Sequence, residues 1–161
     1  MRLRTQLSSL IILTGILISP ALAQSPPADP AKVDATIDTL LGEDSHTKVH
    51  LILTNLQLAV AKHDAAAVAA LVHYPIRVKL HGKPTDINKP QSFIKHYDNI
   101  ITPDIVDVIA KQKYEDLFVN YQGAMLGEGE VWITGFCIDN ACKPPDIKIG
   151  TIQSATAISK K

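Results

Sequence analysis

The chain has 161 residues, of which 46% are hydrophobic, and its 16 Lys and Arg residues balance its 16 Asp and Glu residues. This length is enough for one domain with its own hydrophobic core. The balanced charge gives no indication of a nucleic acid or an anionic lipid as partner, since such binding needs an excess of basic surface, although it does not exclude a local basic patch.

The first 23 residues predict a secretory signal peptide. Arg2 and Arg4 give it a positive start, an apolar stretch follows over 10–18, and Ala21-Leu22-Ala23 offers a small-x-small cleavage site. An uncleaved N-terminal anchor is the alternative, but the apolar stretch is well short of the roughly 20 residues that span a bilayer. We therefore expect cleavage after Ala23, export to the periplasm or the extracellular space, and no stable membrane insertion.

Composition divides the rest of the chain into three parts. Residues 24–32 are rich in proline and predict an extended linker. Residues 33–153 contain the periodic apolar patterns and predict a single α+β domain, whereas residues 154–161 have little to bury and predict a flexible tail. Without the signal peptide, which holds two basic residues and no acidic ones, the net charge is −2.

Cys137 and Cys142 are the two cysteines of the chain, with four residues between them. In an oxidising compartment such a pair is most simply a disulfide, and the intervening Asp139-Asn140 favours a turn that would bring the two sulfurs together. A redox or metal-binding pair is the alternative, but the spacing is not Cys-x-x-Cys and no histidine lies near it in sequence.

Apolar residues at helical spacing predict helices in the first half of the domain. A short helix over 33–41 precedes a long helix that Asp44 or Ser45 would cap. The long helix should break near His63, where Asp64 offers a fresh N-cap for a shorter helix.

Two further helices are predicted downstream. Asn88 and Thr102 are their expected capping residues, and Pro90 and Pro103 fit the first turn of each helix. The expected buried face of the first of them comprises Phe93, Ile94, Tyr97, Ile100 and Ile101.

Alternation of apolar and polar residues predicts strands in two regions. Residues 76–80 alternate and would turn at 81–84 toward a short returning strand at Ile87. Residues 117–152 contain further strand-like stretches, separated by glycines and by the cysteine pair. The predicted fold class is therefore α+β, with N-terminal helices packed in the concave face of a curved antiparallel sheet.

Four stretches of the chain also carry a resemblance. Residues 60–71, 71–78, 93–97 and 120–133 are similar to the broken first helix, its exit into strand one, the following helix and the glycine-bearing hairpin of exported bacterial members of the nuclear transport factor 2-like superfamily. The resemblance covers about residues 45–152 and implies a cone-shaped fold. It implies no single activity, because this fold hosts isomerases, dehydratases, binding modules and assembly domains.

The most distinctive segment for recognition is 120–132, which contains Tyr121, Met125, Glu130 and Trp132 around a glycine-bearing hairpin. Aromatic and methionine side chains provide large, adaptable apolar contact area, so we predict a ligand or partner surface here. The alternative is that Tyr121 and Trp132 fill the interface between sheet and helices.

Two more residues complete the candidate site. Tyr97 lies on a predicted helix beside the titratable Asp98, although its place in the apolar stripe favours packing. Arg77 shares the outward face of the first strand with Lys79, where it is either a solubility charge or the partner of an acidic group.

The histidines do not form a convincing catalytic or metal site. His46 and His50 are four residues apart and could share a helix face, but no third ligand accompanies them. His63 and Asp64 point about 100° apart on a helix, so a helix cap explains Asp64 better than a catalytic pair. We predict no metal and no cofactor.

The preferred hypothesis is an exported, non-enzymatic binding or accessory domain that recognises a protein partner or a small ligand. The alternative is a small isomerase- or dehydratase-type enzyme with a His, Asp or Tyr acid–base pair in an apolar pocket. A homodimer whose sheets pack together is a third possibility. The acids, tyrosines or His-Asp pair of the family's enzymes have no residue-by-residue match in this chain, which favours the first hypothesis.

Overall fold

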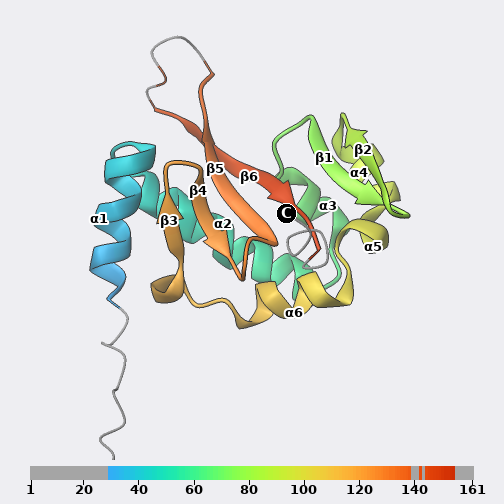
Figure 1. Cartoon of the computed structure of the whole chain (residues 1–161), viewed down its shortest axis with the longest axis horizontal. Coiled ribbons are helices and arrows are strands. Elements are labelled where there is room, and N and C mark those ends of the chain that lie inside the picture. The colour runs from blue at the N-terminus through green and yellow to red at the C-terminus, as the bar shows by residue number, and fades with distance from the viewer. Residues whose placement is uncertain (1–28, 139–141, 143, 155–161) are drawn as a thin grey trace, which may run out of the picture.

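The computed structural model describes residues 29–138, 142 and 144–154 (Figure 1). The predicted signal peptide, most of the predicted linker and the predicted tail after Ser154 lie outside these residues. Within the described part of the chain, none of the helices combines the length and the apolar character needed to span a membrane.

Three helices open the fold: α1 (Pro30–Leu41), α2 (Ser45–Ala61) and α3 (Ala65–Ala70). The Ala31 N–H donates to Asp29 Oδ1 at 3.1 Å, which caps α1. The prediction of an extended linker over 24–32 is therefore wrong for its last three residues. Pro30 begins the helix because the first helical position needs no N–H donor.

The start of α2 is capped from the preceding helix. Asp44 has a left-handed backbone (φ 58°) and no capping hydrogen bond from its side chain, so the prediction that it caps α2 is wrong. Asp38 on α1 takes this role, since the His46 N–H donates to Asp38 Oδ1 at 2.9 Å. The His46 ring also bonds to the same carboxylate, with 2.7 Å between Nδ1 and Oδ2.

The break between α2 and α3 lies where the sequence predicts it. His63 has a φ of 54°, which the right-handed helix cannot continue. The Ala67 N–H then donates to Asp64 Oδ1 at 2.9 Å, so Asp64 caps α3 as predicted.

Three short helices follow the first hairpin: α4 (Pro90–Lys95), α5 (Tyr97–Ile100) and α6 (Pro103–Lys111). The predicted helix after Asn88 divides at His96, and Lys89 occupies its N-cap position. Phe93, Tyr97, Ile100 and Ile101 are buried as predicted, whereas Ile94 is 40% exposed and its predicted burial is wrong. Thr102 precedes α6 at the N-cap position but makes no capping hydrogen bond with its side chain.

The strands form two antiparallel groups. The first is a hairpin of β1 (Ile76–Leu80) and β2 (Lys83–Ile87). The second is a four-stranded sheet in the order β3-β4-β5-β6. Its strands are β3 (Phe118–Asn120), β4 (Gly123–Leu126), β5 (Val131–Phe136) and β6 (Asp146–Ile152).

The chain between α3 and β1 joins the hairpin to the larger sheet. Val72 and Ile149 form a parallel bridge. The His73 N–H donates to the Ile149 carbonyl and the Ile149 N–H donates to the Leu71 carbonyl, both at 2.9 Å. Strand β1 consequently lies beside β6, and Figure 1 shows α2 crossing behind the four-stranded sheet. The α+β class with helices against an antiparallel sheet is confirmed.

The core lies between α2 and the sheet. Its fully buried side chains come from both layers and include Val49, Leu56, Leu126, Val131, Ile133 and Ile149. Beyond the core, the predicted disulfide is confirmed: Cys137 and Cys142 are bonded, with 4.4 Å between their Cα atoms. The Asp139-Asn140 turn predicted between them lies outside the described residues.

Candidate functional site

A row of side chains crosses the four-stranded sheet on the side away from the core. Phe118 on β3 is paired with Met125 on β4, and Met125 is paired with Trp132 on β5. Trp132 is paired in turn with Thr151 on β6. We call Phe118, Met125, Trp132 and Thr151 the outer row. Because directly opposite residues of antiparallel strands lie close together on the same face, these four side chains are neighbours.

The alternation of the strands explains why the outer row is accessible. Val131 and Ile133, on either side of Trp132, are fully buried, as are Ala124 and Leu126 on either side of Met125. Successive side chains in a strand point to opposite faces, so Trp132 and Met125 point away from the core. Both are half-buried, and Phe118 is 54% exposed. The alternative that Trp132 fills the interface between sheet and helices is therefore wrong.

A polar hollow adjoins the row. It has a volume of about 340 Å³ and is lined by Gln122, Trp132, Thr134, Thr151 and Gln153. The Thr134 hydroxyl donates to the Gln122 carbonyl at 3.0 Å, and the Gln153 amide donates to the Gly129 carbonyl at 3.0 Å. The row thus combines an apolar centre with hydroxyl and amide groups at its margin, which is the usual chemistry of a recognition surface.

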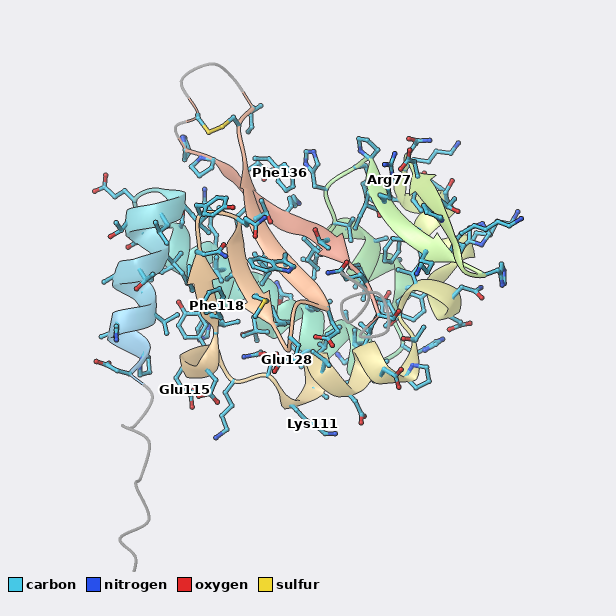
Figure 2. The ribbon with its side chains drawn as sticks, in the orientation of Figure 1. Arg77, Lys111, Glu115, Phe118, Glu128 and Phe136 are labelled. Carbon is cyan, nitrogen blue, oxygen red and sulfur yellow. A yellow bond between two sulfur atoms is a disulfide. The ribbon has the colours of Figure 1, made fainter. Side chains whose placement is uncertain are left out.

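An aromatic pair lies at the far end of β5. The rings of Phe136 and His73 are stacked, with 3.7 Å between their centroids and 5° between their planes. A Cβ atom on Gly150 would lie 2.9 Å from Phe136 Cζ, so the ring would have to shift to admit a larger residue on β6. Figure 2 shows Phe118 and Phe136 at opposite margins of the sheet, with Phe118 at the β3 end of the outer row.

Tyr121 lies at the turn between β3 and β4 and is 81% exposed. The turn is held by the Gln122 N–H, which donates to Asn120 Oδ1 at 2.8 Å. Tyr121 is therefore accessible at the turn and does not fill the core. Of the residues predicted from the segment 120–132, Met125 and Trp132 are brought to the outer face of the sheet, and Tyr121 is exposed at the β3–β4 turn.

Glu130 is not part of the accessible surface. Only 4% of it is exposed, and its carboxylate accepts a hydrogen bond from the Glu128 N–H at 2.7 Å. Its backbone carbonyl accepts from the Gln153 N–H at 2.8 Å. Glu130 organises the tight loop between β4 and β5, and its predicted role in contacting a ligand or partner is corrected to a structural one.

Tyr97, another residue of the predicted binding site, is buried inside the fold. It is 5% exposed and packs edge-on against His63, with 5.0 Å between the ring centroids, and against Phe93. Its hydroxyl has no hydrogen-bond partner among the described residues. Burial raises the pKa of Tyr97, and the charges of Asp98 and Asp64 act in the same direction. Tyr97 therefore packs inside the fold and is not available for the predicted contact with a ligand or partner.

Arg77 pairs with Asp86 across the β1–β2 hairpin. Its Nε donates to Oδ1 at 2.6 Å and its Nη2 donates to Oδ2 at 2.8 Å. The hydrogen bonds raise the pKa of Arg77 and lower that of Asp86. Of the two interpretations of Arg77, the structure therefore shows the pairing with an acidic group.

The three histidines of the N-terminal helices and their junction are each engaged with a neighbour. His46 contacts Asp38, His50 lies against Tyr114 with 4.6 Å between ring centroids, and His63 Nε2 lies 3.2 Å from Asp98 Oδ1. In the described ranges, no three His, Cys, Asp or Glu side chains converge as a metal site would require.

Sequence reasoning missed three members of the face: Phe118, Phe136 and His73. The alternation of Phe118 with Leu117 and Val119 could have placed Phe118 outside, since Leu117 is buried. No local pattern predicts the stack of Phe136 on His73, because these residues are far apart in sequence.

No protein-family model, curated protein or solved structure significantly matches this chain.

Proposed function

We propose that this chain is a small exported binding domain that recognises a protein partner through the outer face of its four-stranded sheet. The observation that carries the proposal is the outer row: Phe118, Met125 and Trp132 are contiguous across three strands. Aromatic and methionine side chains are enriched at the centre of protein interfaces, where they supply most of the binding energy.

The distribution of charge supports recognition by this face. Among the outward positions of β3 to β6, charged side chains are confined to Lys148 and Asp146, away from the outer row. Lys148 is engaged with the Ala70 carbonyl, to which its ammonium donates at 3.2 Å. Charged residues are depleted at interface centres because their desolvation is costly.

The alternative of a small isomerase or dehydratase has less support. Such an enzyme needs at least two titratable groups that converge in an apolar cavity. The buried polar residues of the described chain are Ser45, at the start of α2, and Glu130, in the β4–β5 loop. Neither forms an acid–base pair with a second buried group. The leader sequence and the disulfide support export, and the helix-backed antiparallel sheet supports membership of the nuclear transport factor 2-like superfamily.

The test is capture of partners from envelope extract by wild-type protein, by Phe118→Ser and by Leu58→Ser. Leu58 on α2 is a matched control because it is 53% exposed, compared with 54% for Phe118, and lies on a different face. Loss of a large aromatic contact residue should weaken binding by about 30-fold or more. Capture should therefore fail with Phe118→Ser and persist with Leu58→Ser.

Trp132 provides a second measurement, because it is the one tryptophan of the chain. Its fluorescence should shift when a purified partner covers the outer row. Light scattering of the free protein tests a second copy as the occupant, since a dimer would have twice the monomer mass. Equal capture by both serine variants, with unchanged Trp132 fluorescence, would refute the proposal.

A further inference from the structure

Charge is unevenly distributed over the fold. Between His73 and Tyr97 the chain has five Lys or Arg residues, one carboxylate and three histidines. The other described residues carry six Lys or Arg and fourteen Asp or Glu. We call the β1–β2 hairpin and α4, which form most of this stretch, the basic end. Figure 1 shows it at the end of the molecule opposite α1.

The lysines of the basic end are not neutralised within the chain. Its one carboxylate, Asp86, is occupied by Arg77. The exposed side chains of Lys79, Lys83, Lys89 and Lys95 make no hydrogen bond or ion pair with any described residue. In contrast, Lys111 pairs with Asp107 at 2.9 Å on the acidic remainder of the molecule. The cations at the basic end are therefore available for an external anionic partner.

The arrangement of these lysines favours a broad anionic surface over a small anion. Lys79 and Lys83 flank the two-residue turn at the tip of the hairpin, whereas Lys89 and Lys95 lie at the two ends of α4. Six residues of helix separate the latter two by about 9 Å along its axis. Lysine acts as a compact point charge without the fixed fork of arginine, which suits diffuse attraction to many headgroups.

The basic end also contains an exposed apolar side chain. Ile94 on α4 is 40% exposed and precedes Lys95 in the chain. Exposed prolines, Pro84 on β2 and Pro90 at the start of α4, complete the uncharged part of this surface. Cationic surfaces with an exposed aliphatic side chain attach to membranes by electrostatic attraction together with shallow apolar burial.

We propose that the basic end is a peripheral docking surface for a bilayer of anionic phospholipids. The lysines supply the attraction to the headgroups, and Ile94 adds shallow apolar burial at the headgroup boundary. This inference is independent of the outer row and does not require a membrane-spanning segment.

The test is co-sedimentation of the full chain with vesicles of phosphatidylcholine alone and with equal parts of phosphatidylcholine and phosphatidylglycerol. The protein should bind the anionic vesicles only, and added salt should release it because it screens exposed charges. Each neutralised lysine near the surface should lower the partition coefficient about fivefold. The triple variant Lys79→Gln, Lys83→Gln, Lys95→Gln should therefore bind about a hundredfold more weakly.

The matched control carries the same number of changes elsewhere: Lys32→Gln, Lys111→Gln and Lys113→Gln. It should bind anionic vesicles as the wild type does, and Trp132→Ala should do so as well, which separates this test from that of the outer row. Ile94→Ser should weaken binding with no change in charge. Equal loss in both triple variants would overturn the proposal. So would binding to polyglutamate or duplex DNA without binding to vesicles, since the partner would then be an acidic polypeptide or a nucleic acid.

Discussion

Replacement of Tyr114 by phenylalanine tests what holds the N-terminal helix in place. Tyr114 opens the 3-10 turn η1 (Tyr114–Asp116) before β3, and its hydroxyl donates to Asp34 Oδ1 on α1 at 2.6 Å. Phenylalanine keeps the ring and its contact with His50 but removes this hydrogen bond. Hydrogen bonds to charged groups contribute about 1.5–3 kcal/mol. Because both residues are only partly buried, we expect a loss near the lower end, about 1–2 kcal/mol at neutral pH.

The hydrogen bond also makes stability depend on pH at the alkaline end. Burial raises the pKa of Tyr114, and the hydrogen bond to Asp34 and the charges of Asp34 and Asp38 raise it further. The folded-state pKa thus lies above the unfolded value of about 10. The contribution of Tyr114 is fully present below that unfolded pKa and is lost as the pH rises through the folded-state pKa.

Burial also raises the pKa of Tyr74, to about 12. Ionisation of Tyr74 therefore lowers the free energy of unfolding over the same pH range. Each such tyrosine lowers the free energy of unfolding by up to about 1.4 kcal/mol per pH unit in this range. Tyr114→Phe should remove the contribution of Tyr114 to the fall of the unfolding free energy at alkaline pH. The contribution of Tyr74 should remain.

Urea denaturation followed by circular dichroism from neutral pH to about pH 11 measures both effects. Tyr121→Phe is the matched control, because Tyr121 is 81% exposed. The control should leave stability at neutral pH within about 0.5 kcal/mol of the wild type. Equal destabilisation by the two variants, or an alkaline slope that Tyr114→Phe does not change, would refute this account of the α1 contact.

Two further predictions concern the far end of β5. Gly150→Ala places a Cβ atom 2.9 Å from Phe136 Cζ, so the Phe136 ring must shift. We expect altered near-ultraviolet circular dichroism and a loss of stability of up to about 3 kcal/mol. An unchanged near-ultraviolet spectrum would contradict the close approach. Replacing both Cys137 and Cys142 with serine should cost about 2 kcal/mol, because closing this short loop restricts the unfolded chain. Reductant should lower wild-type stability to the same extent and leave the double variant unaffected.

Local patterns predicted the elements that depend on neighbouring residues. The cap at Asp64, the break at His63 and the start of α6 at Pro103 follow from backbone preferences within a few residues. The cap of α2 could not be found in this way, because Asp38 comes from another helix. The division at His96 was missed for a similar reason, since apolar spacing alone continues across it.

The arrangement of the candidate site could also be predicted only in part from local sequence patterns. The sequence identified Met125 and Trp132 as contact residues from their chemistry, but not the face to which they point or their neighbour Phe118. It also grouped Glu130 with them, although the tight β4–β5 loop buries that carboxylate. Side-chain direction in a sheet depends on register, and a shift of one residue exchanges the two faces.

The sequence by itself determined the fold class and the cysteine pairing, because each depends on residue type and short spacing. Only the tertiary structure decided that Phe118, Met125 and Trp132 form one row and that Phe136 stacks on His73. It also showed that the lysines of the basic end have no acidic partner among the described residues. These properties arise from contacts between segments that are distant in the chain. Strand register and packing create such contacts, and the local preferences of single residues do not encode them.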